Sequence, residues 1–181
     1  MRVLGGELRG QRLVAPRGWR VRPTPARVRE AIFSSLGDVS DSRVLDLYCG
    51  TGALGIEALS RGAAHATLVD RDTRVALGNV EKLGLRDRVT LVSGDVPKCL
   101  AHSGDWGLGT GDFDLIFLDP PYKLAARLGP ELESHLPRYL ATRGRVIVES
   151  AARRPLVLGL PLLRERRYGD TVVSIHGGRG D

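Results

Sequence analysis

Asp112-Phe-Asp-Leu-Ile-Phe-Leu-Asp-Pro-Pro-Tyr122 is the stretch around which the rest of the chain is organised. Its core, Leu115 to Leu118, is apolar at every position, which is typical of a central strand covered by helices on both faces. The two prolines that follow lack an N–H group, so the strand must end there and the next residues are held extended. Asp119 and the Pro120 carbonyl can accept hydrogen bonds, and Tyr122 offers a flat ring. A planar group bearing an NH2 suits this set, although a plain strand followed by a stiff loop fits it too.

Strands and helices alternate on both sides of this stretch. Further apolar runs predict strands at residues 44–47, 66–69, 89–92 and 145–149, and helices are expected at 53–61 and at about 73–83. This alternation indicates a parallel sheet with right-handed crossovers. Residues 162–167 and 171–176 are separated by only three residues, which leaves no room for a helix. We therefore expect an antiparallel hairpin at the carboxyl-terminal end.

Length and composition favour one domain with an appendage. The chain has 181 residues, of which 42% are hydrophobic, enough for one core and too few for two domains of ordinary size. Cys49 and Cys99 have neither disulfide nor metal-site spacing, and no segment has the length and hydrophobicity of a signal peptide or a membrane span. We expect a cytoplasmic protein without metal or membrane association, with an extension at 1–22 and the main domain at 23–181.

The positive charge is concentrated at the amino-terminal end. Residues 1–30 hold eight arginines against two glutamates, a net charge of +6, whereas residues 31–181 hold 19 basic and 19 acidic side chains. Arginine binds phosphate in a fixed fork and stacks on bases, so this segment predicts a nucleic-acid contact, with a solvated basic arm as the alternative. Glycines and short apolar patches within 2–15 favour a two-stranded ribbon. The arginines expected to contact nucleic acid are Arg2, Arg9, Arg12, Arg17, Arg20 and Arg22.

A helix is expected immediately after the basic segment. Thr24 can cap it, with Pro25 at its first position and Gly37 just beyond its end. Its buried stripe should consist of Val28, Ile32 and Leu36, leaving Arg27 and Arg29 turned elsewhere.

A glycine-rich turn follows the first predicted strand. Gly50-Thr51-Gly52-Ala53-Leu54-Gly55 fits the G-x-G-x-x-G fingerprint, and Asp70 lies 20 residues after Gly50. Read literally, this is a nicotinamide-dinucleotide site, but any cofactor that contains a nucleoside has the same requirements. Asp46, Asp95 and Asp119 also lie at or near strand ends. Because open α/β sheets bind ligands beyond the carboxyl ends of their strands, we expect these carboxylates to face one crevice.

At this point the sequence resembles a known family. Val44 to Gly52 and Asp119 to Tyr122 look like the cofactor loop and amine-binding motif of class I S-adenosylmethionine-dependent methyltransferases. Matches to the RsmD-type enzymes, bacterial methyltransferases of a guanine N2 in small-subunit ribosomal RNA, extend over Gly6 to Arg12, Arg22-Pro23-Thr24, Leu54 to Gly62 and Tyr168 to Thr171. The resemblance implies an α/β, Rossmann-like fold with a mostly parallel seven-stranded sheet, a carboxyl-terminal antiparallel hairpin and a small amino-terminal β-ribbon.

The resemblance also implies roles for individual residues. The methionine part of S-adenosylmethionine would be held by Thr24, Asp46, Gly50, Thr51 and Gly52, its ribose by Asp70 and its adenine by Asp95. Asp119 and the Pro120 carbonyl would accept hydrogen bonds from the target amine, and Tyr122 would stack on the base.

The expected partner is ribosomal RNA, free or in a small-subunit particle, and we expect a monomer. Three alternatives stay open: an adenine-N6 methyltransferase on DNA or RNA, an NAD-dependent oxidoreductase, and a non-catalytic RNA-binding assembly protein.

Overall fold

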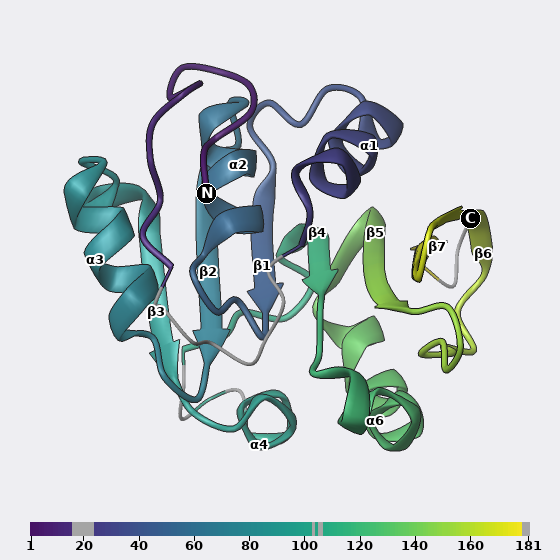
Figure 1. The fold of residues 1–181 in the computed structure, drawn as a ribbon. Helices are drawn as coiled ribbons and strands as arrows, with labels where there is room; N and C mark the ends of the chain where they lie inside the picture. The colour runs from purple at the N-terminus through teal and green to yellow at the C-terminus, as the bar shows by residue number, and fades with distance from the viewer. Residues whose placement is uncertain (16–23, 103, 105–106, 179–181) are drawn as a thin grey trace.

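The computed structural model describes residues 1–15, 24–102, 104 and 107–178, with the backbone alone for residues 122–127. Its strands form one seven-stranded sheet in the order β3-β2-β1-β4-β5-β7-β6 (Figure 1). The strands are β1 (Arg43–Leu47), β2 (His65–Asp70), β3 (Val89–Ser93), β4 (Phe113–Leu118), β5 (Leu140–Ala151), β6 (Leu162–Tyr168) and β7 (Thr171–Gly177). The pairs among β1 to β5 are parallel, and β7 is antiparallel to both β5 and β6. The expected mostly parallel sheet and its terminal hairpin are confirmed.

Helices cover both faces of this sheet. They are α1 (Ala26–Leu36), α2 (Ala53–Ser60), α3 (Arg74–Lys82), α4 (Val96–Ala101) and α6 (Tyr122–His135), with 3-10 turns η1 (Arg86–Arg88) and η2 (Leu136–Arg138). One core contains Ile32 of α1, Ile56 of α2 and Val80 of α3, and the other contains Leu100 of α4 and Leu132 of α6. The first three helices therefore lie on one face and the last two on the other. Within the described ranges no helix is long and apolar enough to cross a membrane.

The predicted start of the first helix is wrong in two details. Thr24 makes no cap, and α1 begins at Ala26 with Pro25 before it. Arg29, expected to turn away from the core, is 1% exposed. Its Nη2 donates to the Arg2 carbonyl oxygen at 2.7 Å, and burial lowers the pKa of its guanidinium. Arg29 is buried because residues 1–15 pack over α1, a contact between segments that helical periodicity does not reveal.

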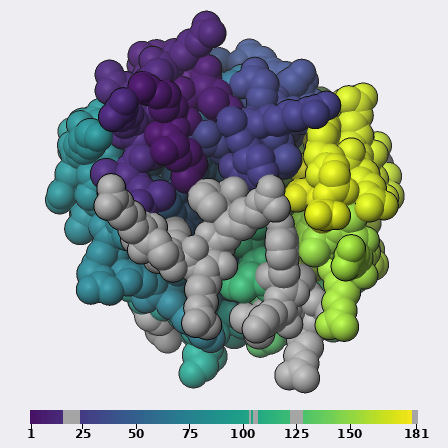
Figure 2. Space-filling model, in the orientation of Figure 1, coloured from purple at the N-terminus to yellow at the C-terminus, as the bar shows by residue number. Residues whose placement is uncertain are grey.

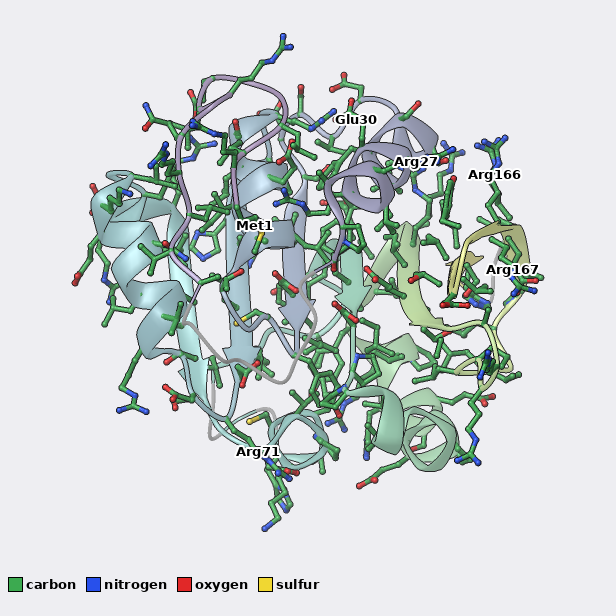
Figure 3. The ribbon with its side chains drawn as sticks, in the orientation of Figure 1. Met1, Arg27, Glu30, Arg71, Arg166 and Arg167 are labelled. Atoms are coloured by element: carbon green, nitrogen blue, oxygen red, sulfur yellow. The ribbon has the colours of Figure 1, made fainter. Side chains whose placement is uncertain are left out.

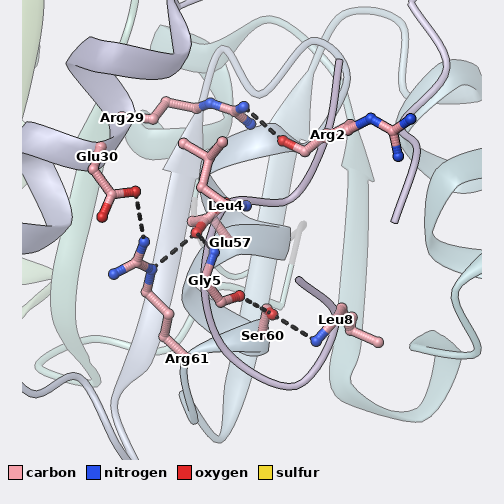
Figure 4. Close-up of polar contacts among 9 residues, drawn as sticks. All are labelled: Arg2, Leu4, Gly5, Leu8, Arg29, Glu30, Glu57, Ser60 and Arg61. Atoms are coloured by element: carbon pink, nitrogen blue, oxygen red, sulfur yellow. Dashed lines mark hydrogen bonds and ion pairs between the residues drawn. The ribbon is translucent and has the colours of Figure 1, made fainter. Parts of the chain in front are cut away.

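Residues 1–15, called here the amino-terminal segment, are held along α2 by side chains of that helix (Figure 4). Glu57 Oε2 and Oε1 accept from the Leu4 and Gly5 N–H groups, both at 2.8 Å, and Ser60 Oγ accepts from Leu8 N–H at 2.9 Å. The predicted two-stranded ribbon is present in a short form. It consists of an antiparallel bridge between Arg2 and Arg12, flanked by backbone hydrogen bonds from Val3 N–H to the Gln11 carbonyl oxygen and from Leu13 N–H to the Met1 carbonyl oxygen, both at 3.0 Å. The domain division at residue 22 stays a prediction.

Candidate active site

The glycine turn after β1 is closed by a carboxylate of the next strand. Gly50 and Gly52 have φ angles of 53° and 75°, in the left-handed region that favours glycine. Gly50 N–H donates to Asp70 Oδ2 at 2.9 Å, and Asp72 N–H donates to Asp70 Oδ1 at 3.2 Å. Asp70 is half-buried at the carboxyl end of β2, and these two hydrogen bonds fix the turn.

Asp46 anchors the start of α2. Its Oδ2 accepts from Gly55 N–H at 2.9 Å, and its side chain is 1% exposed. A Cβ atom at Gly55 would lie 2.4 Å from Leu68 Cδ2, so glycine lets the start of α2 pack closely against the buried Leu68 side chain of β2. Burial raises the pKa of Asp46 to about 7, partly offset by the Gly55 hydrogen bond. The role that the family resemblance implies for Asp46, contact with the cofactor, stays a prediction beside this observed one.

Asp95 is held by a residue that the sequence did not single out. Arg71 Nε donates to Asp95 Oδ2 at 3.0 Å, and Arg71 Nη2 also contacts that oxygen. This contact lowers the pKa of Asp95. Arg71 directly follows Asp70, so its position next to the acidic end of β2 was the sequence signal that could have identified it as a partner of Asp95. The pair orients Asp95 at the edge where a nucleoside is expected.

Asp119 lies on the face of the sheet that carries α1. Phe117, two residues earlier, packs in the α1 core, and side chains alternate along a strand. Thr24 Oγ1, at the entry to α1, donates to Asp119 Oδ2 at 3.0 Å. Leu118 pairs with Val148, which places Asp119 beside Glu149 of β5. Burial and the Glu149 charge raise the pKa of Asp119 well above its usual range, against the Thr24 hydrogen bond.

Pro120, which follows Asp119 after the end of β4, is buried. Tyr122 is the first residue of α6, so the chain turns helical sooner than the prolines suggested. The side chain of Tyr122 lies outside the described part of the structure, and its predicted stacking role stays a prediction.

Asn79 of α3, which sequence reasoning missed, connects the glycine turn after β1 to the amino-terminal segment. It is fully buried. Its Nδ2 donates to the Thr51 carbonyl oxygen at 3.0 Å and to that of Val14 at 3.1 Å, and its Oδ1 accepts from Val14 N–H at 2.7 Å. An amide among apolar neighbours on the buried stripe of a helix was the signal, because a buried amide needs partners.

Three of the predicted RNA-binding arginines, Arg2, Arg9 and Arg12, are exposed on the amino-terminal segment. Figure 2 shows this segment and α1 adjoining on one face of the molecule. Arg17, Arg20 and Arg22 lie outside the described residues.

The chemistry of this edge fits S-adenosylmethionine, whose sulfonium and ammonium groups are cationic. Asp46, Asp70 and Asp95 place carboxylates at or just beyond the carboxyl ends of three neighbouring strands, and the charge of Asp70 contributes to the raised pKa of Asp46. The left-handed glycine turn lets a ligand approach the backbone beside them. No group of three or more His, Cys, Asp or Glu residues within the described part of the chain could hold a metal ion.

The family model described as "Conserved hypothetical protein 95" matches residues 1–177. The Bacillus subtilis protein YlbH is 37% identical over 190 residues, covering 99% of this chain and 100% of YlbH. "Ribosomal RNA small subunit methyltransferase D" of Haemophilus influenzae is 31% identical over 178 residues, covering 93% of this chain and 89% of that protein. The solved structure of yhhF from Escherichia coli superposes with a TM-score of 0.81 at 31% identity, covering 100% and 99% of the two chains. The chain therefore belongs to the conserved hypothetical protein 95 family, which is the RsmD-type family of S-adenosylmethionine-dependent methyltransferases.

Proposed function

We propose that this protein transfers a methyl group from S-adenosylmethionine to the exocyclic N2 of a guanine in small-subunit ribosomal RNA. The observation that carries the proposal is the position of Asp119. It follows β4, accepts a hydrogen bond from Thr24, and lies at the carboxyl ends of the strands that also carry Asp46 and Asp70. The name of the Haemophilus influenzae relative supports small-subunit ribosomal RNA as the substrate. Guanine N2 rests on the resemblance of the whole chain to RsmD-type enzymes.

Asp119 and the Pro120 carbonyl oxygen have the task of orienting the amine. The lone pair of an exocyclic amine is delocalised into the ring, which makes the nitrogen a weak nucleophile. Two acceptors on its protons favour a pyramidal nitrogen with its lone pair directed at the methyl donor. Bound S-adenosylmethionine supplies an activated methyl group on a sulfonium, so the protein contributes mainly positioning and exclusion of water.

Thr24 is a positioning residue in this scheme. Its hydroxyl donates to Asp119 Oδ2 and leaves Oδ1 for the amine. Because an amine inside a duplex cannot reach such a site, the target guanine must be unpaired or turned out of its helix.

The test is to incubate the protein with labelled S-adenosylmethionine and small-subunit ribosomal RNA, either naked or in particles, and to digest the product to nucleosides. The expected result is label in N2-methylguanosine. Label in N6-methyladenosine would show that the methylated base is adenine and not guanine. The absence of transfer to naked RNA and to particles alike, with cofactor bound, would contradict the proposal.

A further inference from the structure

The carboxyl-terminal hairpin carries a second group of exposed arginines. Between residues 152 and 170 there are five arginines and two carboxylates, a net charge of +3, whereas the remainder of residues 31–181 holds 14 basic and 17 acidic side chains. The balanced total for residues 31–181 conceals this separation. The hairpin basic surface consists of Arg164, Arg166 and Arg167 of β6 together with Arg153 and Arg154 from the turn that follows β5, all exposed.

This surface reaches the carboxyl ends of the parallel strands, where the candidate active site lies. Ala151, at the end of β5, pairs with Thr171, which pairs in turn with Tyr168 at the end of β6. The β6–β7 turn is therefore at the carboxyl end of the parallel strands, as Asp119 is. β6 is three strands from β4 in the sheet order, a separation of about 14 Å at the usual strand spacing.

Two of the arginines point to the same side of the sheet as α1. Arg164 pairs with Ile175 and Arg166 with Val173, and cross-strand partners share a face. Ile175 and Val173 pack in the core beneath α1. In Figure 2 the hairpin adjoins α1, and in Figure 3 Arg27 of α1 and Arg166 extend from the body on this side.

Resting on the function proposed above, we propose that the hairpin basic surface binds phosphates of the ribosomal RNA that flank the target nucleotide. The sheet order puts β6 at one edge, whereas the amino-terminal segment is bonded to α2 and α3 over the other half. The RNA would thus be held on both sides of Asp119. Phosphate is the ligand class because the guanidinium groups are exposed and in excess over carboxylates.

A competing explanation is that the arginines only protect an exposed sheet edge. Charged side chains on edge strands prevent pairing with other chains, and glutamate does so as well as arginine. A charge reversal therefore separates the two roles, because it keeps the edge protected and repels phosphate.

The experiment compares Arg166→Glu with Arg143→Glu in the full chain. Arg143 is also exposed, but lies toward the amino end of β5, away from the candidate site. The probe is a naked, fluorescent small-subunit ribosomal RNA fragment, titrated at several salt concentrations. We expect Arg166→Glu to weaken binding about tenfold at low salt and to reduce the slope of log affinity against log salt by about 1, with Arg143→Glu within about twofold of the original.

Equal affinities for the two variants would overturn the inference. A loss of affinity by Arg166→Glu that appears only with particles would also overturn it, because it would assign the surface to a ribosomal protein. A loss of affinity that light scattering traces to self-association of the variant would overturn it as well. Methyl transfer by the unsubstituted protein is measured separately. Failure of that transfer contradicts the proposed function, whereas the binding comparison decides the role of the surface.

Discussion

Asp46 makes the stability of the protein depend on pH. Its pKa in the folded protein is about 7, against an ordinary value of 3.8. Between these two pH values the folded protein keeps a proton that the unfolded chain has lost, and this tighter proton binding stabilises the folded state. The contribution is complete below pH 3.8 and is lost as the pH rises through 7. The slope is at most about 1.4 kcal/mol per pH unit.

Asp46→Asn should flatten this dependence, because the amide oxygen still accepts from Gly55 N–H and carries no charge. The measurement is the free energy of unfolding in urea at pH 5 and pH 8 without cofactor. Asp87→Asn, at an exposed position in η1, is the control. The same decrease with pH in Asp46→Asn as in the original protein would rule out Asp46 as its source.

Glu149 should set the pH at which Asp119 becomes an acceptor. Its negative charge is one cause of the raised pKa of Asp119, so transfer should increase with pH as Asp119 loses its proton. Glu149→Gln removes the repulsion and lowers that pKa. We expect the acidic limb of the single-turnover rate profile to move to lower pH, with thermal unfolding checked in parallel. An unmoved limb would mean that another group controls it.

Among the secondary-structure elements, α3 links the glycine turn after β1 to the amino-terminal segment. Asn79→Ala removes hydrogen bonds to Thr51 and Val14 and takes this donor away from the buried Thr51 carbonyl oxygen. The free energy of unfolding should fall by about 2–3 kcal/mol. Glu81→Ala, on the exposed side of the same helix, should change it by less than about 0.5 kcal/mol. Similar losses for both would show that helix propensity, and not the link, is responsible.

Local sequence patterns predict the strands of this protein but not the tertiary contacts between them. Strands β1 to β4 were predicted within about two residues because their apolar runs are continuous and glycines mark the intervening turns. Thr24 and Asp119 are 95 residues apart, and no local pattern encodes their hydrogen bond. Arg29 looked exposed for the same reason. The residues at the strand ends were therefore predictable, whereas the partners that fix them depend on tertiary packing.

For the whole molecule, the amino-terminal segment cannot be treated as a removable arm. Its Val3 and Leu13 are buried in the main core, so deleting residues 1–15 would disturb the fold as well as RNA binding. Arg9→Ala with Arg12→Ala is the cleaner change, because both side chains are exposed. We expect weaker binding of ribosomal RNA and a salt slope lower by about 1.4, which is about 0.7 for each phosphate contact on a single strand.

The measurement of that prediction is a titration at several salt concentrations. Lys82→Ala, at an exposed position of α3, is a useful comparison because it removes a positive charge whose Nζ already donates to the Arg12 carbonyl oxygen. A double variant that keeps the original slope would exclude the amino-terminal segment from RNA contact.

In the proposed function, one half of the site presents the methyl donor and the other half, at Asp119, holds the amine. The most direct test is Asp119→Ala, assayed for cofactor affinity and for single-turnover methyl transfer to small-subunit ribosomal RNA. Because Asp119 is assigned to the amine, cofactor affinity should stay within a few-fold while transfer falls by at least about 100-fold, or about 2.7 kcal/mol in the barrier. Transfer at the original rate with the cofactor bound would contradict the account.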